Sequence, residues 1–512
     1  MKPLALDAVA ACLANDAASP EATRPLRPTP LSERLLSAPV LLRVLPGSGH
    51  QDEWQTITVS GVCSDSRDAA PGKIFFCFAG EKTDGHDHAP QAVAAGITAI
   101  IATRDPLAKE RDMGLPLPPV FLVSNVQDAL WLLALRQRSQ TKARVVGITG
   151  TAGKTTLKES LASILSCQGN TEKSHKNFNT QIGLSMSMIN ADEDADFWVM
   201  EAGISQPHDM EELGSILQPD LSLILNAGVG HVQGLGDKGV DWHKASLSHY
   251  TAPEGFVLVN ADYPKLVVGV GRYKEYFLTN SIQTVTFGSQ SPARIKARYD
   301  GQTEEGKGRY LVDMDGKDHT CIAPFFGTYG AENMAALASA VALLGVPMPK
   351  IQEGLDKVTL PDMRFRRQEI GSVTLIDDSY NSNPLSAQRM LEAASILARE
   401  SGRALYCVLG EMRELGDDAQ SLHTSLGRQA AAVAPFGILW KGQYWENVLL
   451  GLNDADYKGY FVQAQTLEDF ISQTRKIGLA DIVVLFKGSR GNRLEEYVEE
   501  FTIMLQGATR AI

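Results

Sequence analysis

Residues 147–157 read GITGTAGKTTL, a glycine-rich loop that ends in a lysine and two threonines. The apolar residues Val145 to Ile148 form the end of a predicted buried strand, and residues 155–167 repeat apolar side chains with the period of a helix. A glycine loop between a strand and a helix points backbone N–H groups and a helix N-terminus at one place, which creates a cradle for anions. We therefore predict a phosphate-binding loop that uses a nucleoside triphosphate.

The loop contains the residues that we expect to bind ATP. Lys154 can reach the β- and γ-phosphates, and the Thr155 hydroxyl can hold Mg²⁺. The loop departs from the strict Walker A pattern, because Ile148 stands where that pattern has a glycine. A glycine loop alone is often only a turn, but the adjoining lysine and threonine favour phosphate binding. The predicted ATP contacts here are Gly150, Thr151, Ala152, Gly153, Lys154, Thr155 and Thr156.

Composition limits the classes of protein to consider. At 512 residues, with 44% hydrophobic and 21% charged residues, the chain has room for about three globular domains. A net charge of -12 argues against nucleic acid or an anionic membrane as partner. None of the six cysteines forms a C-x-x-C pair, so we expect reduced thiols rather than disulfides or a zinc site. Residues 1–14 predict a short helix rather than a signal peptide, and no stretch is long enough to span a membrane. We expect a cytoplasmic monomer.

The pattern of strands and helices predicts an α/β fold with three domains. Residues 1–142 form a small N-terminal α/β domain in which 17–56 is a loosely structured insertion. Residues 143–360 form a central doubly wound parallel sheet with the phosphate loop, and 361–512 a Rossmann-like C-terminal domain. The predicted strands are 74–78, 99–101, 145–148, 197–200, 221–225, 373–376, 405–409, 437–440 and 482–486. The predicted helices are 155–167, 331–344, 384–399, 419–433, 467–477 and 492–501.

Two further strand ends of the central domain carry candidate site residues. Glu201 follows the strand 197–200, and a carboxylate beside a phosphate loop is a natural ligand for Mg²⁺. His231 lies within NAGVGHVQGLG, residues 226–236, where glycines indicate a tight loop at the end of a strand. A strand-end glutamate can simply be solvated, and a lone histidine is usually structural. Their positions at the carboxyl ends of parallel strands favour a site.

The C-terminal domain has polar clusters at three strand ends. DDSYNSNP, residues 377–384, brings Asp378, Tyr380 and Asn381 before a helix, where the competing interpretation is an ordinary helix-capping turn. LGEMRELG, residues 409–416, is followed by His423. KGSR, residues 487–490, offers a lysine and an arginine that suit a carboxylate or phosphate, although solvated charges at a helix start are equally compatible.

Together these motifs resemble the Mur ligase family of cytoplasmic peptidoglycan enzymes, over nearly all of the chain from residue 57 onward. The strings 377–384, 409–416 and 487–490 resemble the branch whose substrates are a UDP-linked muramoyl tripeptide and D-alanyl-D-alanine. The resemblance implies ATP-dependent amide bond formation through an acyl phosphate, with Mg²⁺ as cofactor. It also implies that the C-terminal domain closes over ATP.

The resemblance implies roles for individual residues of this chain. It adds Asn333, Arg364 and Asp378 to the ATP contacts, and it makes Thr155, Glu201 and His231 the magnesium ligands. Lys154, His231 and Lys244 are the expected catalytic residues. Asn177 and Asn179 belong to a segment that approaches the γ-phosphate, and we expect them to bind the UDP-linked substrate. The other expected contacts to that substrate are Ser64, Asp65, Ser66 and Arg67. The expected contacts to the incoming amine are Tyr380, Asn381, Asn383, Lys487 and Arg490.

Members of this family carry a carbamylated lysine that bridges a second magnesium ion. Lys244, in WHKA at residues 242–245, is the candidate, with Lys238 as the second choice. Carbamylation replaces a cation by anionic oxygens, which explains how a lysine comes to lie among metal ligands. A plain surface lysine on a helix is the competing interpretation.

The chain departs from the family pattern at Thr180, Gln181, Ser185, His243 and Met363. These departures leave room for a related ligase that takes another amino acid or a secondary-metabolite substrate. Two hypotheses outside the ligases are an ATPase or switch built on the phosphate loop and a catalytically inactive binding module. Lys154, Thr155, Glu201 and His231, all of them intact, argue against the inactive module.

Overall fold

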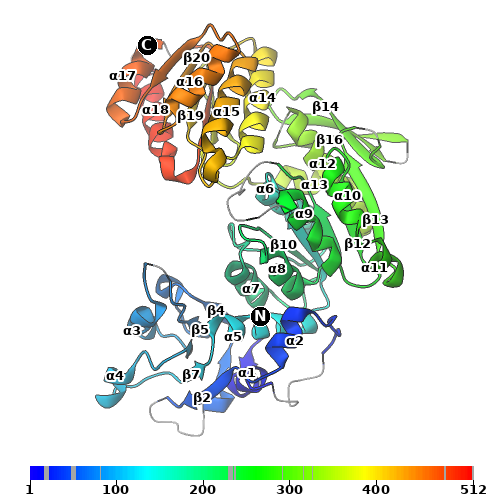
Figure 1. Ribbon diagram of the computed structural model, residues 1–512, viewed down its shortest axis with the longest axis vertical. Helices are drawn as coiled ribbons and strands as arrows, with labels where there is room; N and C mark the ends of the chain where they lie inside the picture. The colour runs from blue at the N-terminus through cyan, green and yellow to red at the C-terminus, as the bar shows by residue number, and fades with distance from the viewer. Residues whose placement is uncertain are drawn as a thin grey trace.

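The computed structural model describes residues 1–15, 22–47, 54–80, 82–228, 235, 238–290, 292–314, 316–325, 327–477 and 480–509. Three consecutive parts of the chain each have their own main sheet and follow one another along the long axis of the molecule (Figure 1). The predicted α/β architecture with three parts is therefore confirmed.

The N-terminal part has a five-stranded sheet in the order β2-β7-β6-β5-β4. Both faces are apolar, because Phe75 and Ile100 face one core while Phe76 and Ile101 face the other. Its strands are β1 (Leu4–Ala5), β2 (Leu41–Leu45), β3 (Thr58–Val59), β4 (Gly61–Cys63), β5 (Lys73–Phe76), β6 (Ala99–Ala102) and β7 (Val120–Val123), of which β1 and β3 pair separately. Its helices are α1 (Leu6–Leu13), α2 (Pro30–Leu36), α3 (Ala89–Ala94), α4 (Ala108–Asp112) and α5 (Val126–Gln140).

The expectation of a loosely structured insertion at 17–56 is wrong for residues 30–45. Thr29 and Ser32 form a capping box that starts α2, with Pro30 in the first turn. Leu31 and Leu35 are buried, and β2 pairs antiparallel with β7. The buried face of α2 is thus formed by Leu31 and Leu35. Residues 16–21 and 48–53 lie outside the described residues.

The central part has a nine-stranded sheet in the order β16-β15-β14-β13-β12-β11-β8-β10-β9. The strands from β9 to β14 run parallel, and β14, β15 and β16 pair antiparallel at one edge. The strands are β8 (Arg144–Thr149), β9 (Thr171–Lys173), β10 (Phe197–Glu201), β11 (Leu221–Ile224), β12 (Phe256–Asn260), β13 (Gln283–Gly288), β14 (Ile295–Gln302), β15 (Gly308–Met314) and β16 (Lys317–Ala323). The helices are α6 (Lys154–Ser166), α7 (Gln181–Asn190), α8 (Asp209–Leu217), α9 (Gly239–Ala245), α10 (Pro264–Gly271), α11 (Lys274–Thr279), α12 (Gly327–Leu343) and α13 (Met348–Lys357).

The order of the central strands determines where a ligand can bind. β8 lies between β10 and β11, so the chain leaves β8 toward one side of the sheet and later returns to its other side. Ligands of parallel α/β sheets bind outside the carboxyl ends of the strands at such a switch point. The ends of β8, β10 and β11 are where Gly150, Glu201 and Asn226 lie.

The C-terminal part has a six-stranded sheet in the order β17-β18-β22-β19-β20-β21, parallel except for the edge strand β17. The four predicted strands and four predicted helices are present, and the last helix runs further than predicted. The strands are β17 (Arg366–Ile370), β18 (Val373–Asp378), β19 (Ala404–Gly410), β20 (Gly437–Lys441), β21 (Tyr460–Gln463) and β22 (Ile482–Lys487). The helices are α14 (Pro384–Ser401), α15 (Ala419–Ala432), α16 (Trp445–Asp454), α17 (Leu467–Ile477) and α18 (Leu494–Thr509).

The contact between the N-terminal and central parts includes the side-chain amide of Asn190, in the last turn of α7. Its Oδ1 accepts a hydrogen bond from the backbone N–H of Val62 at 2.8 Å, and its Nδ2 donates to the carbonyl of Val62 at 3.1 Å. Val62 belongs to β4, the last strand of the N-terminal sheet. The central part thus binds the edge of that sheet through one amide.

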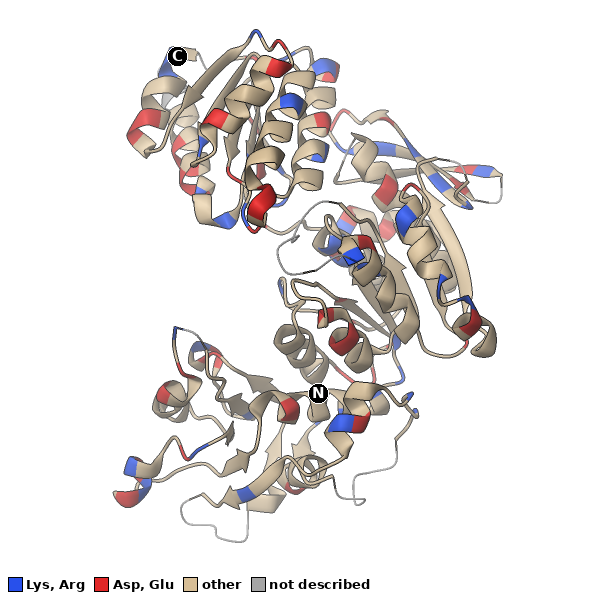
Figure 2. Ribbon diagram, in the orientation of Figure 1, with Lys and Arg blue, Asp and Glu red and all other residues tan. Residues whose placement is uncertain are grey.

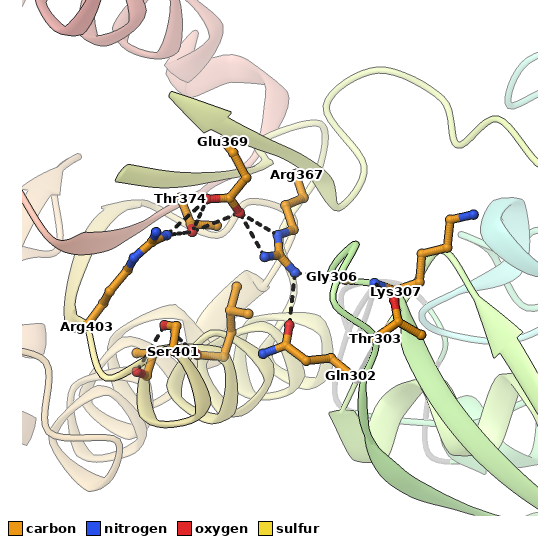
Figure 3. Close-up of polar contacts among 11 residues, drawn as sticks. Gln302, Thr303, Gly306, Lys307, Arg367, Glu369, Thr374, Ser401 and Arg403 are labelled. Carbon is orange, nitrogen blue, oxygen red and sulfur yellow. Dashed lines mark hydrogen bonds and ion pairs between the residues drawn. The ribbon is translucent and has the colours of Figure 1, made fainter. Parts of the chain in front are cut away.

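The contact between the central and C-terminal parts includes a polar cluster around Arg367 of β17 (Figure 3). Arg367 donates to the carbonyl of Gly306 at 2.8 Å and to Oε1 of Gln302 at 3.2 Å, both in the β14–β15 segment. Glu369 accepts from Arg367 at 2.9 Å and from Arg403 at 3.0 Å. This cluster joins the two parts away from the phosphate loop.

Charged residues lie mainly on helices and connecting loops, with basic and acidic positions interspersed (Figure 2). Among the described residues, no helix is both long and apolar enough to cross a membrane.

Candidate active site

The glycine loop adopts a conformation that its sequence requires. Gly153 has a φ of +83°, and a Cβ there would lie 2.9 Å from the hydroxyl of Tyr329. The backbone N–H groups of Thr151 and Ala152 donate to Oδ1 of Asn226, at 3.0 and 2.9 Å. Asn226, directly after β11, therefore holds the loop open at the N-terminus of α6. Sequence reasoning included Asn226 in a motif but gave it no role.

Two lysines lie beside this loop. Lys154 and Lys244 each donate to the carbonyl oxygen of Gly150, at 2.8 and 2.9 Å. Burial lowers the pKa of Lys154, and the cationic Arg364 lowers it further while Glu201 raises it. Burial, reinforced by Lys154, holds the pKa of Lys244 well below its usual range. α9 thus brings Lys244 directly to the phosphate loop. The second choice, Lys238, is exposed, with its ammonium 5.3 Å from the ring centre of Trp242.

Glu201, the last residue of β10, is fully buried, and neither of its carboxylate oxygens has a hydrogen-bond partner. Burial of such a carboxylate is unfavourable without a compensating cation, and among the described residues the ammonium of Lys158 lies 3.5 Å from its Oε1. The Thr155 hydroxyl lies on the wall of the same cavity. These oxygens fit the hard, oxygen-rich coordination of Mg²⁺ with few protein ligands. His231, the other predicted ligand from the β11 loop, lies outside the described residues.

Lys158 is a site residue that sequence reasoning missed. It occupies the second turn of α6 and is fully buried, with Nζ 3.5 Å from Oε1 of Glu201. Nζ also donates to the carbonyls of Ser174 and Lys176, at 2.8 and 2.7 Å. A lysine on a helix is normally expected to be exposed to solvent. The only sign that Lys158 is buried was its position between the apolar residues Leu157 and Leu161.

A cavity of about 410 Å³ joins the central and C-terminal parts beside the phosphate loop. It brings together most of the predicted ATP, metal and amine residues. The predicted residues on its wall are Thr151, Ala152, Gly153, Lys154, Thr155, Thr156, Asn177, Asn179, Glu201, Lys244, Arg364, Asp378, Tyr380, Asn381, Asn383 and Lys487. Gly150 and Asn333 do not line it, although Tyr329, one turn before Asn333 on α12, does. Asn333 is buried, and neither amide atom of its side chain has a hydrogen-bond partner.

The C-terminal residues of the cavity are interlinked. Oδ1 of Asp378 accepts from the backbone N–H of Phe365 at 3.0 Å, and its Oδ2 lies 2.7 Å from Nζ of Lys487. The guanidinium of Arg364 lies 4.3 Å from the ring centre of Tyr380. Asn383 is the N-cap of α14, and its Nδ2 lies 3.5 Å from the carbonyl oxygen of Thr151. The end of β18 is thus both a helix-capping turn and part of the cavity wall.

The remaining predicted residues lie away from this cavity. Asp65 caps a short 3₁₀ turn and binds Arg67, which lowers the pKa of Asp65 to about 2. Ser66 donates to Gln91 at 2.8 Å, and the Ser64 hydroxyl lies 3.5 Å from the sulfur of Met186. These residues belong to the N-terminal part, where the other end of a long substrate would bind. Arg490 interacts with Met363 and Glu495 outside the cavity, and the ring nitrogens of His423 bond Met412 and Ala419 within the C-terminal core.

Three family models match consecutive parts of the chain. "Mur ligase family, catalytic domain" matches residues 58–129, "Mur ligase middle domain" residues 148–342, and "Mur ligase, glutamate ligase domain" residues 363–490.

The chain belongs to the Mur ligase family.

Curated relatives of this Mur ligase match it over most of their length. The UDP-N-acetylmuramoyl-tripeptide–D-alanyl-D-alanine ligase of Bacillus subtilis is 27% identical, over 90% of this chain and 97% of that protein. The ligase of the same name from Escherichia coli is 29% identical, over 86% and 93%. Among solved structures, MurF from Acinetobacter baumannii superposes with a TM-score of 0.76 at 25% identity, over 93% of this chain and 99% of that chain. MurF from Thermotoga maritima in complex with ADP has a TM-score of 0.72 at 25% identity, over 88% and 99%.

These similarities confirm the resemblance inferred from the motifs and make this Mur ligase an ATP-dependent amide ligase. The ADP bound to the Thermotoga protein supports ATP as the nucleotide. An ATPase or switch without a covalent product, and an inactive binding module, are correspondingly disfavoured. The roles of single residues stay predictions.

Proposed function

We propose that this protein joins D-alanyl-D-alanine to UDP-N-acetylmuramoyl-tripeptide at the expense of ATP, in cytoplasmic synthesis of peptidoglycan precursors. The observation that carries the proposal is the cavity in which the phosphate loop, Glu201 and Lys244 meet Arg364 and Asp378 of the C-terminal part. Relatives that share this layout over nearly their whole length are named for this reaction.

The reaction has two steps. A carboxylate oxygen of the peptide attacks the γ-phosphorus of ATP. The bond between that phosphorus and the oxygen that bridges to the β-phosphate breaks, so ADP departs and the peptide carries an acyl phosphate. The amine of the dipeptide then attacks the acyl carbon and loses a proton. The bond between the acyl carbon and the phosphate oxygen breaks, and inorganic phosphate leaves. The first step brings two anions together, so its barrier depends on groups that offset their repulsion. Lys154 and the backbone N–H groups at the start of α6 provide this.

Mg²⁺ would be held by the Thr155 hydroxyl, the Glu201 carboxylate, His231 and a carbamylated Lys244. When bound, the metal neutralises phosphate charge and acts as a Lewis acid. Lys158 lies against Oε1 of Glu201, which leaves Oε2 available to the cavity. We keep His231 in this set as a proposal from the family resemblance.

Carbamylation of Lys244 resolves a conflict visible in the geometry. Two ammonium groups on one carbonyl oxygen, that of Gly150, repel each other in a buried site. Addition of CO2 to the neutral amine of Lys244, with loss of a proton, converts one of them into an anion beside the cation Lys154. The resulting oxygens are ligands of the kind that Mg²⁺ prefers.

Substrate contacts follow from the placement of the remaining residues. Asn177 and Asn179 line the cavity and are placed to meet the peptide end of the UDP-linked substrate, whereas residues 64–67 would meet its UDP end. Tyr380, Asn381 and Asn383 are the amine contacts on the cavity wall. Lys487 is held by Asp378, so its part is to fix that carboxylate. Arg490 stays a predicted amine contact, although its guanidinium interacts with Met363 and Glu495 outside the cavity.

The acyl phosphate must be protected from water, and the C-terminal part provides the cover. Asn383 reaches the carbonyl of Thr151 in the phosphate loop, so the start of α14 lies directly over the loop. We propose that ATP binding favours this docked arrangement through Arg364 and Asp378, and that the protein acts as a monomer.

The test is phosphate release from ATP and Mg²⁺ with UDP-N-acetylmuramoyl-tripeptide and D-alanyl-D-alanine, added singly and together. Release only with both, and a product heavier than the tripeptide substrate by the dipeptide less one water, is expected. Release with neither substrate would identify an ATPase. Turnover with a different acid and amine, and none with this pair, would keep the chemistry and replace the substrates.

A further inference from the structure

Arg389 is a cavity residue that neither the motifs nor the comparisons assign. It lies in the second turn of α14, is 7% exposed, and lines the cavity at the contact between the central and C-terminal parts. Its Nη2 donates to Oε2 of Glu332 on α12 and to the hydroxyl of Tyr263. Oε2 of Glu332 also accepts from Asn260 at 3.2 Å. One nitrogen of the guanidinium therefore has its partners in the central part.

The other terminal nitrogen, Nη1, is shielded from solvent and has no hydrogen-bond partner. A buried, charged donor without an acceptor is unfavourable, and a guanidinium has only donors to offer. The neighbouring Asn333 is in the same condition, with both amide atoms buried and unpartnered. Glu332, which anchors Arg389, is adjacent to Asn333 in sequence. Nη1 of Arg389 and the side-chain amide of Asn333 are thus two sets of buried polar atoms without hydrogen-bond partners.

Tyr329 lies between the phosphate loop and Arg389. Its ring centre is 5.1 Å from the guanidinium carbon of Arg389, and its hydroxyl lies against Gly153 of the phosphate loop. The ring therefore separates the loop from Arg389. If the triphosphate of ATP binds at the loop, on one side of Tyr329, the space on the other side, toward Arg389, is left for the nucleoside.

We propose that Arg389 binds the nucleoside end of ATP, donating from Nη1 to an acceptor on the base or ribose, with Glu332 and Tyr263 holding its orientation. This inference rests on the proposed use of ATP. A nucleoside bound in this way would contact both α12 and α14, so the same contact would favour docking of the C-terminal part.

The test separates a nucleotide contact from a mere contact between domains. Arg367 provides the matched control, because it also joins the C-terminal part to the central part but lies outside the cavity (Figure 3). ADP binding is measured by calorimetry for the wild type, Arg389→Ala and Arg367→Ala, with inorganic tripolyphosphate as the probe that lacks a nucleoside. We expect Arg389→Ala to weaken ADP about tenfold, Arg367→Ala to change it less than about twofold, and tripolyphosphate to bind all three alike.

Arg389→Ala leaves Glu332 without its buried cation, so the variant can fail to fold for that reason alone. The double variant Arg389→Met with Glu332→Gln removes both charges and is expected to show the same loss of ADP affinity. Wild-type ADP affinity in the double variant would overturn the inference, as would equal losses in Arg389→Ala and Arg367→Ala or a parallel loss of tripolyphosphate. A wild-type protein that binds no ADP would instead overturn the proposed function.

Discussion

Lys154 and Lys244 donate to one acceptor, the carbonyl oxygen of Gly150, at 2.8 and 2.9 Å. They come from different elements, the phosphate-loop helix α6 and the later helix α9. Two protonated amines so close in a buried site would repel each other, and burial together with Lys154 holds the pKa of Lys244 well below its usual range. The two lysines can therefore be distinguished experimentally, because carbamylation would make one of them an anion while the other stays a cation.

Lys154→Ala is expected to lower kcat for phosphate release about 10²- to 10³-fold, as for the loss of one main electrostatic stabiliser. Lys265→Ala, on α10 outside the cavity, is the control and should leave kcat unchanged. Near-normal turnover in Lys154→Ala would exclude the proposed role of the phosphate loop.

Lys244 is expected to carry a carbamate when the protein is exchanged into ¹³C-bicarbonate. The measurement is ¹³C NMR, in which a carbamate carbon should appear in the wild type and be absent in Lys244→Arg. The Lys238→Arg variant, altered at an exposed site, should keep the signal. A signal that survives in Lys244→Arg and disappears in Lys238→Arg would reverse the assignment.

Lys158→Met should lower stability, because it leaves the buried carboxylate of Glu201 without the ammonium that lies 3.5 Å away. Loss of one partner of a buried pair costs about 3–5 kcal/mol. Lys458→Met, which removes an exposed ion pair to Asp456, should change stability by less than about 0.5 kcal/mol. Scanning calorimetry checks both, and Mg²⁺ with ADP should stabilise Lys158→Met less than the wild type if Glu201 loses its position. Equal Tm values for the wild type and Lys158→Met would contradict this account.

Acid should destabilise the protein through His249. Burial and the neighbouring Arg27 and Arg272 lower the pKa of His249 to about 4, and Nε2 faces the Arg27 guanidinium at 3.1 Å. The pKa of His249 is lower in the folded state than in the unfolded one. Its contribution to the free energy of unfolding is therefore complete above about pH 6.5 and is lost as pH falls toward 4. Allowing for partial exposure, the loss is about 2 kcal/mol.

The variant His249→Phe keeps an aromatic ring against Tyr273 but cannot titrate. The fall in Tm between pH 7 and pH 5 should therefore be smaller in His249→Phe than in the wild type. An identical fall in both proteins would assign the acid sensitivity to other groups.

Cysteine labelling should single out Cys167 in the native protein. Burial raises the pKa of Cys63 to about 11 and of Cys77 to about 12, which keeps their thiols protonated and unreactive. Cys167 is partly exposed at the end of α6, with Nζ of Lys357 3.4 Å from its sulfur. Mass spectrometry after brief iodoacetamide treatment at pH 8 should find Cys167 modified first. Earlier modification of Cys63 or Cys77 would contradict the packing of the N-terminal sheet.

The interior elements could be predicted from the sequence because their signals are local. Strands such as β8 and β11 are short apolar runs, and α14 has both its helical period and its capping asparagine in one stretch. The edge strands β9 and β17 were not predicted, because their residues, TEK and RRQEI, contain no apolar run. The strands β12 (FVLVN) and β21 (YFVQ) do contain apolar runs and were also missed. Their pairing depends on neighbours far away in sequence.

The site shows the same division. Lys154 and Glu201 could be found at the ends of recognisable elements, whereas Lys244 was named only from the family resemblance, and the structure brings all three to one cavity. Lys158 and Arg389 could not, because a charged residue on a helix ordinarily faces water. Each is buried against a carboxylate from a different element, Glu201 for Lys158 and Glu332 for Arg389.

The amide of Asn190 that joins α7 to β4 has a consequence for folding. β4 is the outermost strand of the N-terminal sheet, and Asn190 occupies the N–H and C=O of Val62 as a neighbouring strand would. An uncovered strand edge is a template for pairing with other chains. Until the central part has folded and supplied this amide, the N-terminal part exposes that template, so newly made chains are most prone to aggregate in the interval between the two events.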